Sequence, residues 1–408
     1  MGDTVQRSRA RIRGFDDPEL DFQLMRSLAA AEAGGGCFGE IMAARTAIGD
    51  GGPAAWTREF DVMAQRVLRF ADERLAAGRG ISAREAYLRA AEYFRSAEYF
   101  EDPRTERQRS LGLAARDAFM AYARLLSRPP TPLAIPFEGM EIGGYFFSAG
   151  EGPRPTLMAL SGFDGTSEEI YLGLGKGALD RGYNLLVFDG PGQMGARRRF
   201  PEVHFRPDYE TPISAVIDYA LSRPDVDPDR LILMGISFGG YFATRAAAHD
   251  RRIKGLIANS PIVDLRAYMV GFIGGEQALQ GVVSEGDFGI DDLANIPDEY
   301  FPPAQKANTI ALLVRFGQPT FLSVYNHLRE YIVGDALSNI ACPCLAMAGE
   351  GEGGETLRQF EAFASGVSGP VEKRLFTVEE GADAHCQANN PALSRAVVFD
   401  WLEGQFGQ

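Results

Sequence analysis

Apolar runs alternate with amphipathic stretches from about residue 133 to the C-terminus. The runs suited to buried strands lie at 155–161, 183–188, 231–234, 253–259, 344–348 and 372–378. The stretches with helical spacing between and after them lie at 168–181, 209–222, 355–364 and 391–406. Strands that alternate with helices in this way form a mostly parallel sheet with helices on both faces. The pattern therefore predicts an α/β fold.

The first third of the chain has a different pattern, with helical periodicity from about residue 18 to residue 127. Ser82-Ala83-Arg84-Glu85 has the spacing of a capping box at the start of one helix. Asp102-Pro103 is typical of the N-cap and first turn of another. We expect an N-terminal helical domain over residues 1–132, ending in the proline-rich stretch 128–132.

The alternation stops between residues 262 and 338. This interval is expected to hold a Gly/Asp-rich loop and two helices, at 271–292, 304–316 and 320–333. An insertion at this point would lie over the carboxyl ends of the strands, where folds of this kind bind ligands. We expect a core made of 133–261 and 339–408, with a helical cap insertion over 262–338.

The most informative motif is Gly235-Ile236-Ser237-Phe238-Gly239, which follows the apolar run 231–234 and precedes a helical stretch. A G-x-S-x-G sequence between strand and helix is a nucleophile elbow, which presents a serine hydroxyl from a tight turn. Glycine suits positions 235 and 239 because a side chain would collide with the flanking strand or helix. The alternative is a glycine-rich turn with an incidental serine. The flanking elements favour Ser237 as a nucleophile.

A serine nucleophile needs a base, and the base needs a carboxylate that orients it. Behind this motif the chain order is serine, acid, histidine. His385 is the only histidine late enough in the chain to be the base. The acid is expected after the strand 344–348. In related enzymes it commonly lies three residues after a glycine, which selects Glu352. Glu350 is the second candidate and Asp383 a weak third, because near neighbours in an extended loop point apart.

Acyl chemistry also needs backbone N–H groups that stabilise a developing oxyanion. The residue after the nucleophile, Phe238, is expected to supply one donor. The loop that follows the strand 155–161 is expected to supply the other, from the Phe163 N–H. Gly162 would allow a close approach to substrate, and Asp164 belongs to the same predicted substrate-contacting loop. A turn that is merely glycine-rich is the alternative.

Composition and charge limit the kinds of molecule that the protein is expected to bind. The chain has 408 residues, 41 Lys and Arg against 55 Asp and Glu, and a net charge of −14. This charge disfavours nucleic acid and anionic membranes. No apolar run has the length of a membrane span, and no apolar region follows the N-terminal arginines as in a secretory signal. The scattered cysteines and histidines lack metal-ligand spacing. We expect a cytoplasmic protein that acts on a small molecule without metal or cofactor.

Six stretches resemble the α/β-hydrolases, and within them the polyketide-shortening hydrolases of fungal pigment pathways and dihydropseudooxynicotine hydrolase. They are LSGFDGTSEE (160–169), FDGPGQ (188–193), FRPDYE (205–210), GISFGGYFATRAA (235–247), EEGADAHCQANN (379–390) and FDWL (399–402). The resemblance covers nearly the whole chain, and the loop 379–390 is its most specific part. Met194 departs from the family's pattern, which has glycine there, and so does the glutamate-rich acid loop. The resemblance implies an α/β-hydrolase core, metal-free chemistry and a homodimer.

Together these features predict a serine-dependent hydrolase of a polyketide-like secondary metabolite. The bond cleaved is expected to be a C–C bond next to a carbonyl, an ester or a thioester, and the sequence leaves these open. A cyclase or acyltransferase would use the same residues with an internal nucleophile in place of water. A catalytically silent hydrolase fold that serves as a helical dimerisation platform is the alternative from another class.

Overall fold

The computed structural model describes residues 8–284 and 286–407, which form two compact units. The first unit contains residues 8–10, 131–284, 286–288 and 316–407, and the second contains residues 11–130 and 289–315. The expected helical domain, 1–132, differs from the second unit, whose first segment is 11–130 and which also contains 289–315. The expected cap insertion over 262–338 does not form one body. Its middle part groups with the N-terminal helices, and its two flanks group with the α/β unit.

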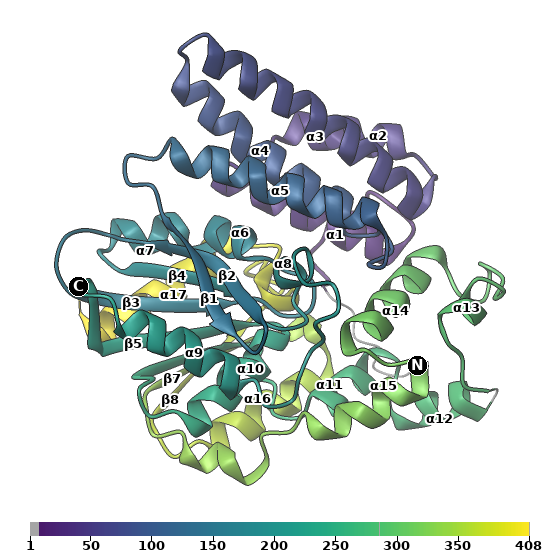
Figure 1. Ribbon diagram of the computed structural model, residues 1–408. Coiled ribbons are helices and arrows are strands. Elements are labelled where there is room, and N and C mark those ends of the chain that lie inside the picture. Colours follow the sequence, from purple (N-terminus) through teal and green to yellow (C-terminus); the bar gives the residue numbers. More distant parts are fainter. Residues whose placement is uncertain (1–7, 285, 408) are drawn as a thin grey trace. The chain divides into compact units, whose positions relative to one another are not determined.

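An eight-stranded sheet is the centre of the first unit (Figure 1), in the order β1-β2-β4-β3-β5-β6-β7-β8. The strands are β1 (Thr131–Phe137), β2 (Met140–Phe147), β3 (Arg154–Leu160), β4 (Asn184–Asp189), β5 (Val226–Ile236), β6 (Gly255–Asn259), β7 (Cys344–Gly349) and β8 (Val371–Phe376). β2 is antiparallel to both of its neighbours, and every other neighbouring pair is parallel. The predicted α/β class is confirmed.

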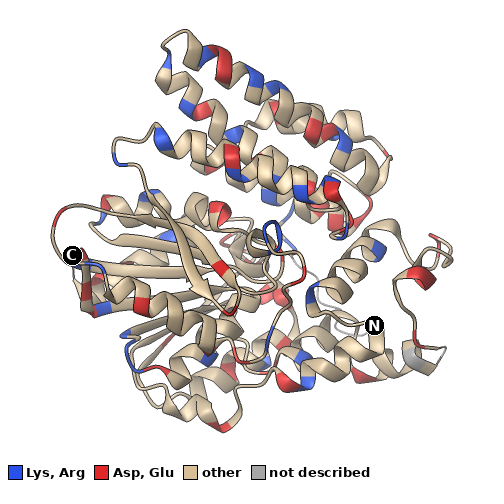
Figure 2. Ribbon diagram, in the orientation of Figure 1, with Lys and Arg blue, Asp and Glu red and all other residues tan. Residues whose placement is uncertain are grey.

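Local sequence explains the hairpin turn at one edge of this sheet and the burial of two of its interior strands. Glu138 and Gly139 join β1 to β2 with positive φ angles of 43° and 83°, as a two-residue hairpin turn of type I′ requires. The interior strands β6 and β7 carry no charged residue and are buried along their whole length. Figure 2 shows the charged residues mainly on helices and loops. Strands covered on both faces have this continuous apolar character.

Helices cover both faces of the sheet (Figure 1). One face carries α9 (Glu210–Leu221), α10 (Phe238–His249) and α16 (Gly354–Gly366), and the other carries α6 (Ser167–Ile170), α7 (Lys176–Asp180) and α17 (Pro391–Phe406). The helix expected over 168–181 is interrupted by a π-helical turn at Tyr171–Gly175. Two glycines in this turn weaken regular helix geometry. No helix within the described ranges is long and apolar enough to cross a membrane.

The remaining helices of this unit are α8 (Met194–Arg197), α11 (Leu265–Phe272), α12 (Glu276–Ser284) and α15 (Phe321–His327). The prediction of a loop over 271–292 is wrong, because α12 occupies its middle. Glutamate, glutamine, alanine and leucine in α12 favour a helix. The glycines on either side of α12 concealed it in the sequence pattern.

The second unit is helical and has its own core. Its helices are α1 (Pro18–Ala30), α2 (Phe38–Ile48), α3 (Gly52–Ala76), α4 (Gly80–Glu98), α5 (Glu106–Arg124) and α13 (Ile290–Leu293), with most of α14 (Pro303–Phe316). Trp56 of α3 is buried, and its indole Nε1 donates to the Ser96 carbonyl of α4 at 2.8 Å. The Trp56 ring also packs against Phe60, with centroids 4.5 Å apart. This buried indole connects α3 and α4 through packing and a satisfied hydrogen bond.

Both helix caps predicted in this unit are wrong. α4 begins at Gly80, so Ser82 lies within its first turn, and the residue before the helix provides no side-chain cap. α5 begins at Glu106, where Thr105 accepts a hydrogen bond from the Gln108 N–H at 3.2 Å. Asp102 instead pairs with Arg104 at 2.6 Å. Threonine is among the preferred N-cap residues, and the ion pair with Arg104 occupies the carboxylate of Asp102.

The parallel register places the carboxyl ends of the central strands at one edge of the sheet. Leu160 of β3 lies beside Gly235 of β5, and Ile236 lies beside Asn259 of β6. Gly349 of β7 lies beside Phe376 of β8. The loops that follow β3, β5, β6, β7 and β8 therefore emerge side by side. The residues predicted to carry chemistry lie in these loops or, for Phe238, at the start of the helix that follows β5.

The turn after β5 predicts a large stability effect for Gly235→Ala. A Cβ at position 235 would lie 1.8 Å from the Gly239 carbonyl oxygen. We expect the free energy of unfolding to fall by at least about 3 kcal/mol. Gly404→Ala, in α17, is the matched control because no heavy atom lies within 4 Å of its added Cβ, and it should change stability by no more than about 1 kcal/mol. Urea denaturation measures both, and equal effects would contradict this account of the turn.

Candidate active site

Ser237 occupies a turn in which the backbone is tightly packed. Its φ of 60° and ψ of −126° are unfavourable for a residue with a side chain. Its N–H donates to the Asn259 carbonyl at 2.6 Å, and its carbonyl accepts from the Gly240 N–H at 2.8 Å. A Cβ at position 240 would lie 1.7 Å from the Ser260 carbonyl oxygen. Close contact with the end of β6 therefore holds the turn, and α10 begins at the next residue.

The structure brings together the three side chains that the sequence predicted to act jointly. Ser237 Oγ lies 3.0 Å from His385 Nε2, and His385 Nδ1 lies 2.5 Å from Glu352 Oε2. Glu352 is almost fully buried, whereas the His385 side chain keeps 15% of its surface exposed. In this arrangement Nδ1–H donates to the carboxylate and Nε2 is free to accept the serine proton.

The environment of Glu352 distinguishes it from the two other acid candidates. The Glu352 carboxylate also accepts from Ser260 Oγ at 2.7 Å and from the Gly349 N–H at 2.9 Å. Glu350 instead accepts from the Val378 N–H at 3.2 Å. The Asp383 carboxylate accepts hydrogen bonds from the N-terminal segment, 373 to 375 residues away in the chain. Of the three, Glu352 is the one bonded to His385.

Neighbouring groups favour the charged form of His385. Burial disfavours the imidazolium, but the adjacent Cys386 sulfur and Glu352 carboxylate favour it more strongly and raise the pKa of His385 to about 10. Cys386 Sγ lies 3.5 Å from His385 Nε2, and the Tyr268 hydroxyl of α11 lies 3.5 Å from Nδ1. The raised pKa makes His385 a stronger base than a free imidazole.

The loop predicted to help form an oxyanion hole lies against the elbow. A Cβ at Gly162 would lie 2.5 Å from the Phe238 nitrogen and 2.7 Å from Ser237 Cβ. Phe163 and Phe238 are close as well, with ring centroids 5.5 Å apart. Gly162 is buried, and Phe163 and Asp164 are half-buried. The predicted donors thus belong to two adjacent backbone segments, and glycine at position 162 is what permits their close approach.

Gln193, which the sequence reasoning did not single out, holds this loop. Its fully buried side chain donates to the Ser161 carbonyl at 2.5 Å and accepts from the Gly190 N–H at 2.7 Å. Gln193 therefore links the loop after β4 to the loop after β3. Ser260 was missed too, although it directly follows β6. A polar residue that follows a buried strand at this edge of the sheet was the signal that could have identified Ser260. The same signal is weaker for Gln193, which lies four residues after the end of β4.

Aromatic side chains surround the elbow on the side of the oxyanion loop. Phe205 packs against Phe163 with centroids 6.0 Å apart and against Phe316 with centroids 5.0 Å apart. Phe238 lies 6.2 Å from Tyr268, edge to face. Edge-to-face and offset contacts of this kind hold rings in defined orientations. Aromatic rings therefore line this side of Ser237.

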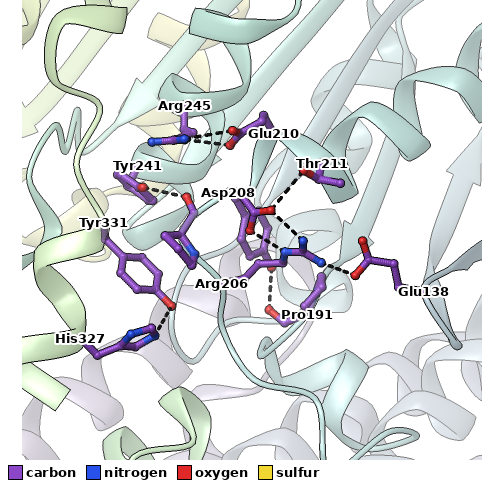
Figure 3. A network of polar contacts seen from close by, with 12 residues as sticks. Glu138, Pro191, Arg206, Asp208, Glu210, Thr211, Tyr241, Arg245, His327 and Tyr331 are labelled. Carbon is purple, nitrogen blue, oxygen red and sulfur yellow. Dashed lines mark hydrogen bonds and ion pairs between the residues drawn. The ribbon is translucent and has the colours of Figure 1, made fainter. Parts of the chain in front are cut away.

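Polar contacts fix the segment that carries Phe205 (Figure 3). The Arg206 guanidinium contacts the Asp208 carboxylate at 2.7 Å and Glu138 at 2.6 Å. The Tyr241 hydroxyl of α10 donates to the Pro207 carbonyl at 2.8 Å. These contacts connect residues 205–208 to the β1–β2 turn and to the helix that follows Ser237. They therefore hold Phe205 close to the elbow.

Within residues 8–284 and 286–407, no group of three or more His, Cys, Asp and Glu side chains is arranged to hold a metal ion. The polar groups beside the elbow are Ser237, His385 and Glu352 with the adjacent backbone amides. This set suits attack on a carbonyl carbon followed by proton transfer.

Known proteins match both the sequence and the fold. The model of the prolyl oligopeptidase family matches residues 177–282. Hydrolase LUC6 from a Fusarium species is 32% identical, with 96% of this chain and 98% of the relative covered. Hydrolase ORFZ from Pyricularia oryzae is 30% identical with the same coverage. The crystal structure of 2,6-dihydroxy-pseudo-oxynicotine hydrolase has a TM-score of 0.69 at 22% identity, covering 93% of this chain and 95% of that one. The chain therefore belongs to the α/β-hydrolase superfamily, as an enzyme of the family that includes these fungal hydrolases.

Proposed function

We propose that the protein is a serine-dependent hydrolase that cleaves a C–C bond next to a carbonyl, or an ester or thioester, in a polyketide-like small molecule. The observation that carries the proposal is the hydrogen-bonded chain from Ser237 Oγ through His385 to Glu352, with separations of 3.0 and 2.5 Å. The resemblance to polyketide-shortening hydrolases and the apolar rings beside Ser237 support the substrate class.

In the first step Ser237 Oγ attacks the substrate carbonyl carbon and His385 Nε2 accepts the serine proton. Glu352 stabilises the imidazolium that forms, and the Phe238 and Phe163 amides donate to the oxyanion. When the intermediate collapses, the C–C, C–O or C–S bond breaks and the leaving group takes the bonding electrons. His385 returns the proton to that carbanion, alkoxide or thiolate. Water, activated by His385, then hydrolyses the acyl-serine and yields a carboxylic acid.

Covalent labelling tests the nucleophile. A fluorophosphonate probe should modify the wild-type protein at Ser237 because the hydroxyl is activated by His385. Ser237→Ala should remain unlabelled, and His385→Ala should react at least about 10²-fold more slowly. Intact-protein and peptide mass spectrometry measure both the extent and the position. Labelling of Ser237→Ala to the wild-type extent would refute the assignment, and absence of labelling in every variant would favour a silent fold.

Product analysis tests the reaction type. Incubation in H₂¹⁸O with a β-diketone, an aryl ester and an acyl thioester should release a carboxylic acid that carries ¹⁸O from at least one of the three. A cyclic or transferred acyl product without ¹⁸O would indicate a cyclase or acyltransferase instead.

The proposal also includes a homodimer and a cytoplasmic location. Sedimentation of the purified protein measures whether it is a dimer.

The pH dependence tests the acid and the base together. The base must be neutral to accept a proton, and the pKa of His385 is raised, so kcat/KM should rise with pH with a midpoint above about 6.5. Glu352→Gln should lower the midpoint, because it removes the charge that favours imidazolium, and should reduce kcat by about 10²–10⁴-fold. Glu350→Gln, the matched control, should leave the midpoint unchanged and kcat within about twofold.

The reverse ranking of the two glutamine variants would move the acid assignment to Glu350. A midpoint that stays in place when Glu352 is neutralised would show that its carboxylate does not act on His385.

A further inference from the structure

Asp383 is a buried carboxylate for which the proposed reaction has no use. It lies two residues before His385, and its side chain has no exposed surface. Its oxygens accept from the Arg9 N–H at 2.5 Å, from Ser8 Oγ at 3.2 Å and from the Ala10 N–H at 3.3 Å. Asn389 Nδ2 donates to the same carboxylate at 3.0 Å. A buried carboxylate is stable only when hydrogen bonds of this kind compensate its charge.

The loop that carries His385 binds both the backbone N–H groups and a backbone carbonyl of the N-terminal segment. Asn389 Nδ2 also donates to the Ala10 carbonyl at 3.1 Å, while the amides of Arg9 and Ala10 point to Asp383. Asn389 Oδ1 accepts from the Ala384 N–H at 3.3 Å, next to the catalytic histidine in sequence. Ser8 is buried as well. Residues 8–10 are thus held as a bound peptide would be, by donors and acceptors from one loop.

The main chain of Asp383 contacts the loop that carries the acid. Its carbonyl accepts from the Gly351 N–H at 3.0 Å, one residue before Glu352. The fit is close, because a Cβ at Gly351 would lie 2.6 Å from Asp383 Oδ2 and one at Gly349 would lie 2.3 Å from the Asp383 carbonyl oxygen. Asp383 therefore joins three segments, namely residues 8–10, the acid loop and the histidine loop.

We propose that Asp383 is a positioning residue and that residues 8–10, bound to its carboxylate, hold the His385 loop in register with Glu352. The proposal rests on the proposed function of Ser237, His385 and Glu352. A displacement of about 1 Å in a reacting group can lower a rate by about 10²-fold. The separation of 2.5 Å between His385 Nδ1 and Glu352 Oε2 depends on two loops that Asp383 connects. Release of the N-terminal segment would loosen one side of that connection.

The test removes a single backbone donor from the full-length chain. Arg9→Pro removes the N–H that makes the 2.5 Å bond. Arg9→Ala keeps that N–H and is the matched reference, so the ratio between the two variants isolates the bond. Asp383→Asn replaces one of the two accepting oxygens with an NH₂ group, which donates and so cannot accept from residues 8–10. The readouts are 4-nitrophenyl butyrate hydrolysis from pH 5 to 10 and the rate of fluorophosphonate labelling at Ser237.

We expect Arg9→Pro to reduce kcat and the labelling rate by about tenfold or more relative to Arg9→Ala, with KM changed less than about twofold. The pH midpoint should move down, because His385 separates from Glu352 while Cys386 and Tyr268, the other titratable groups beside it, stay in place. Asp383→Asn should behave in the same way. The double variant that combines Arg9→Pro with Asp383→Asn should be no slower than the slower single variant, because both substitutions break the same contact between Arg9 and Asp383.

Equal rates and equal midpoints for Arg9→Pro and Arg9→Ala would overturn the proposal, and so would multiplicative losses in the double variant. Thermal unfolding identifies any variant that fails to fold. In that case Ser8→Ala, which removes only the 3.2 Å hydroxyl bond, is measured instead. A two- to fivefold loss of kcat with a lowered pH midpoint would support the proposal, and an unchanged kcat and midpoint would overturn it. Ser237→Ala is run alongside. If it hydrolyses the ester as the wild type does, the proposed function fails rather than the positioning role.

Discussion

The hydrogen bond between His385 and Glu352 is the constraint on which the rest of the site depends. The two residues lie on different loops, after β8 and β7, and their side chains meet at 2.5 Å. Neither side chain is long enough to compensate for a shift of one strand by a residue, since each step along a strand moves the chain by about 3.3 Å. The pairing of Gly349 with Phe376 sets where both loops begin. The sheet register therefore determines whether the imidazole can be oriented for Ser237.

Around this bond, buried polar side chains connect loops that the sheet brings close but does not join. Ser260 contacts the Glu352 carboxylate, and Gln193 connects the loops after β3 and β4. Asp383 connects the acid loop, the histidine loop and residues 8–10. Each of these residues is fully buried, so each broken contact would leave a polar group without a partner in an apolar environment. The loops are stable in combination rather than singly.

Much of this was visible in the sequence because it depends on local patterns. The apolar runs marked the strands, and the Gly-x-Ser-x-Gly turn with the chain order of Ser237 and His385 followed from backbone crowding and from the fold. The position of the acid in related enzymes, three residues after a glycine, selected Glu352. The contacts of Ser8 and Asp383 could not be predicted, since residues 375 positions apart share no local pattern. The start of α4, the cap of α5 and the helix α12 were misjudged because neighbouring residues offered plausible local alternatives. The grouping of residues 289–315 with the N-terminal helices depends on packing alone.

Proton NMR in water measures the central interaction directly. A proton shared between His385 Nδ1 and a carboxylate at 2.5 Å is strongly deshielded and protected from exchange by burial. We predict a resonance far downfield of the backbone amides in the wild-type protein, which is lost in both His385→Ala and Glu352→Gln and kept in Glu350→Gln. A wild-type spectrum without that resonance, or a resonance that survives Glu352→Gln, would contradict the account.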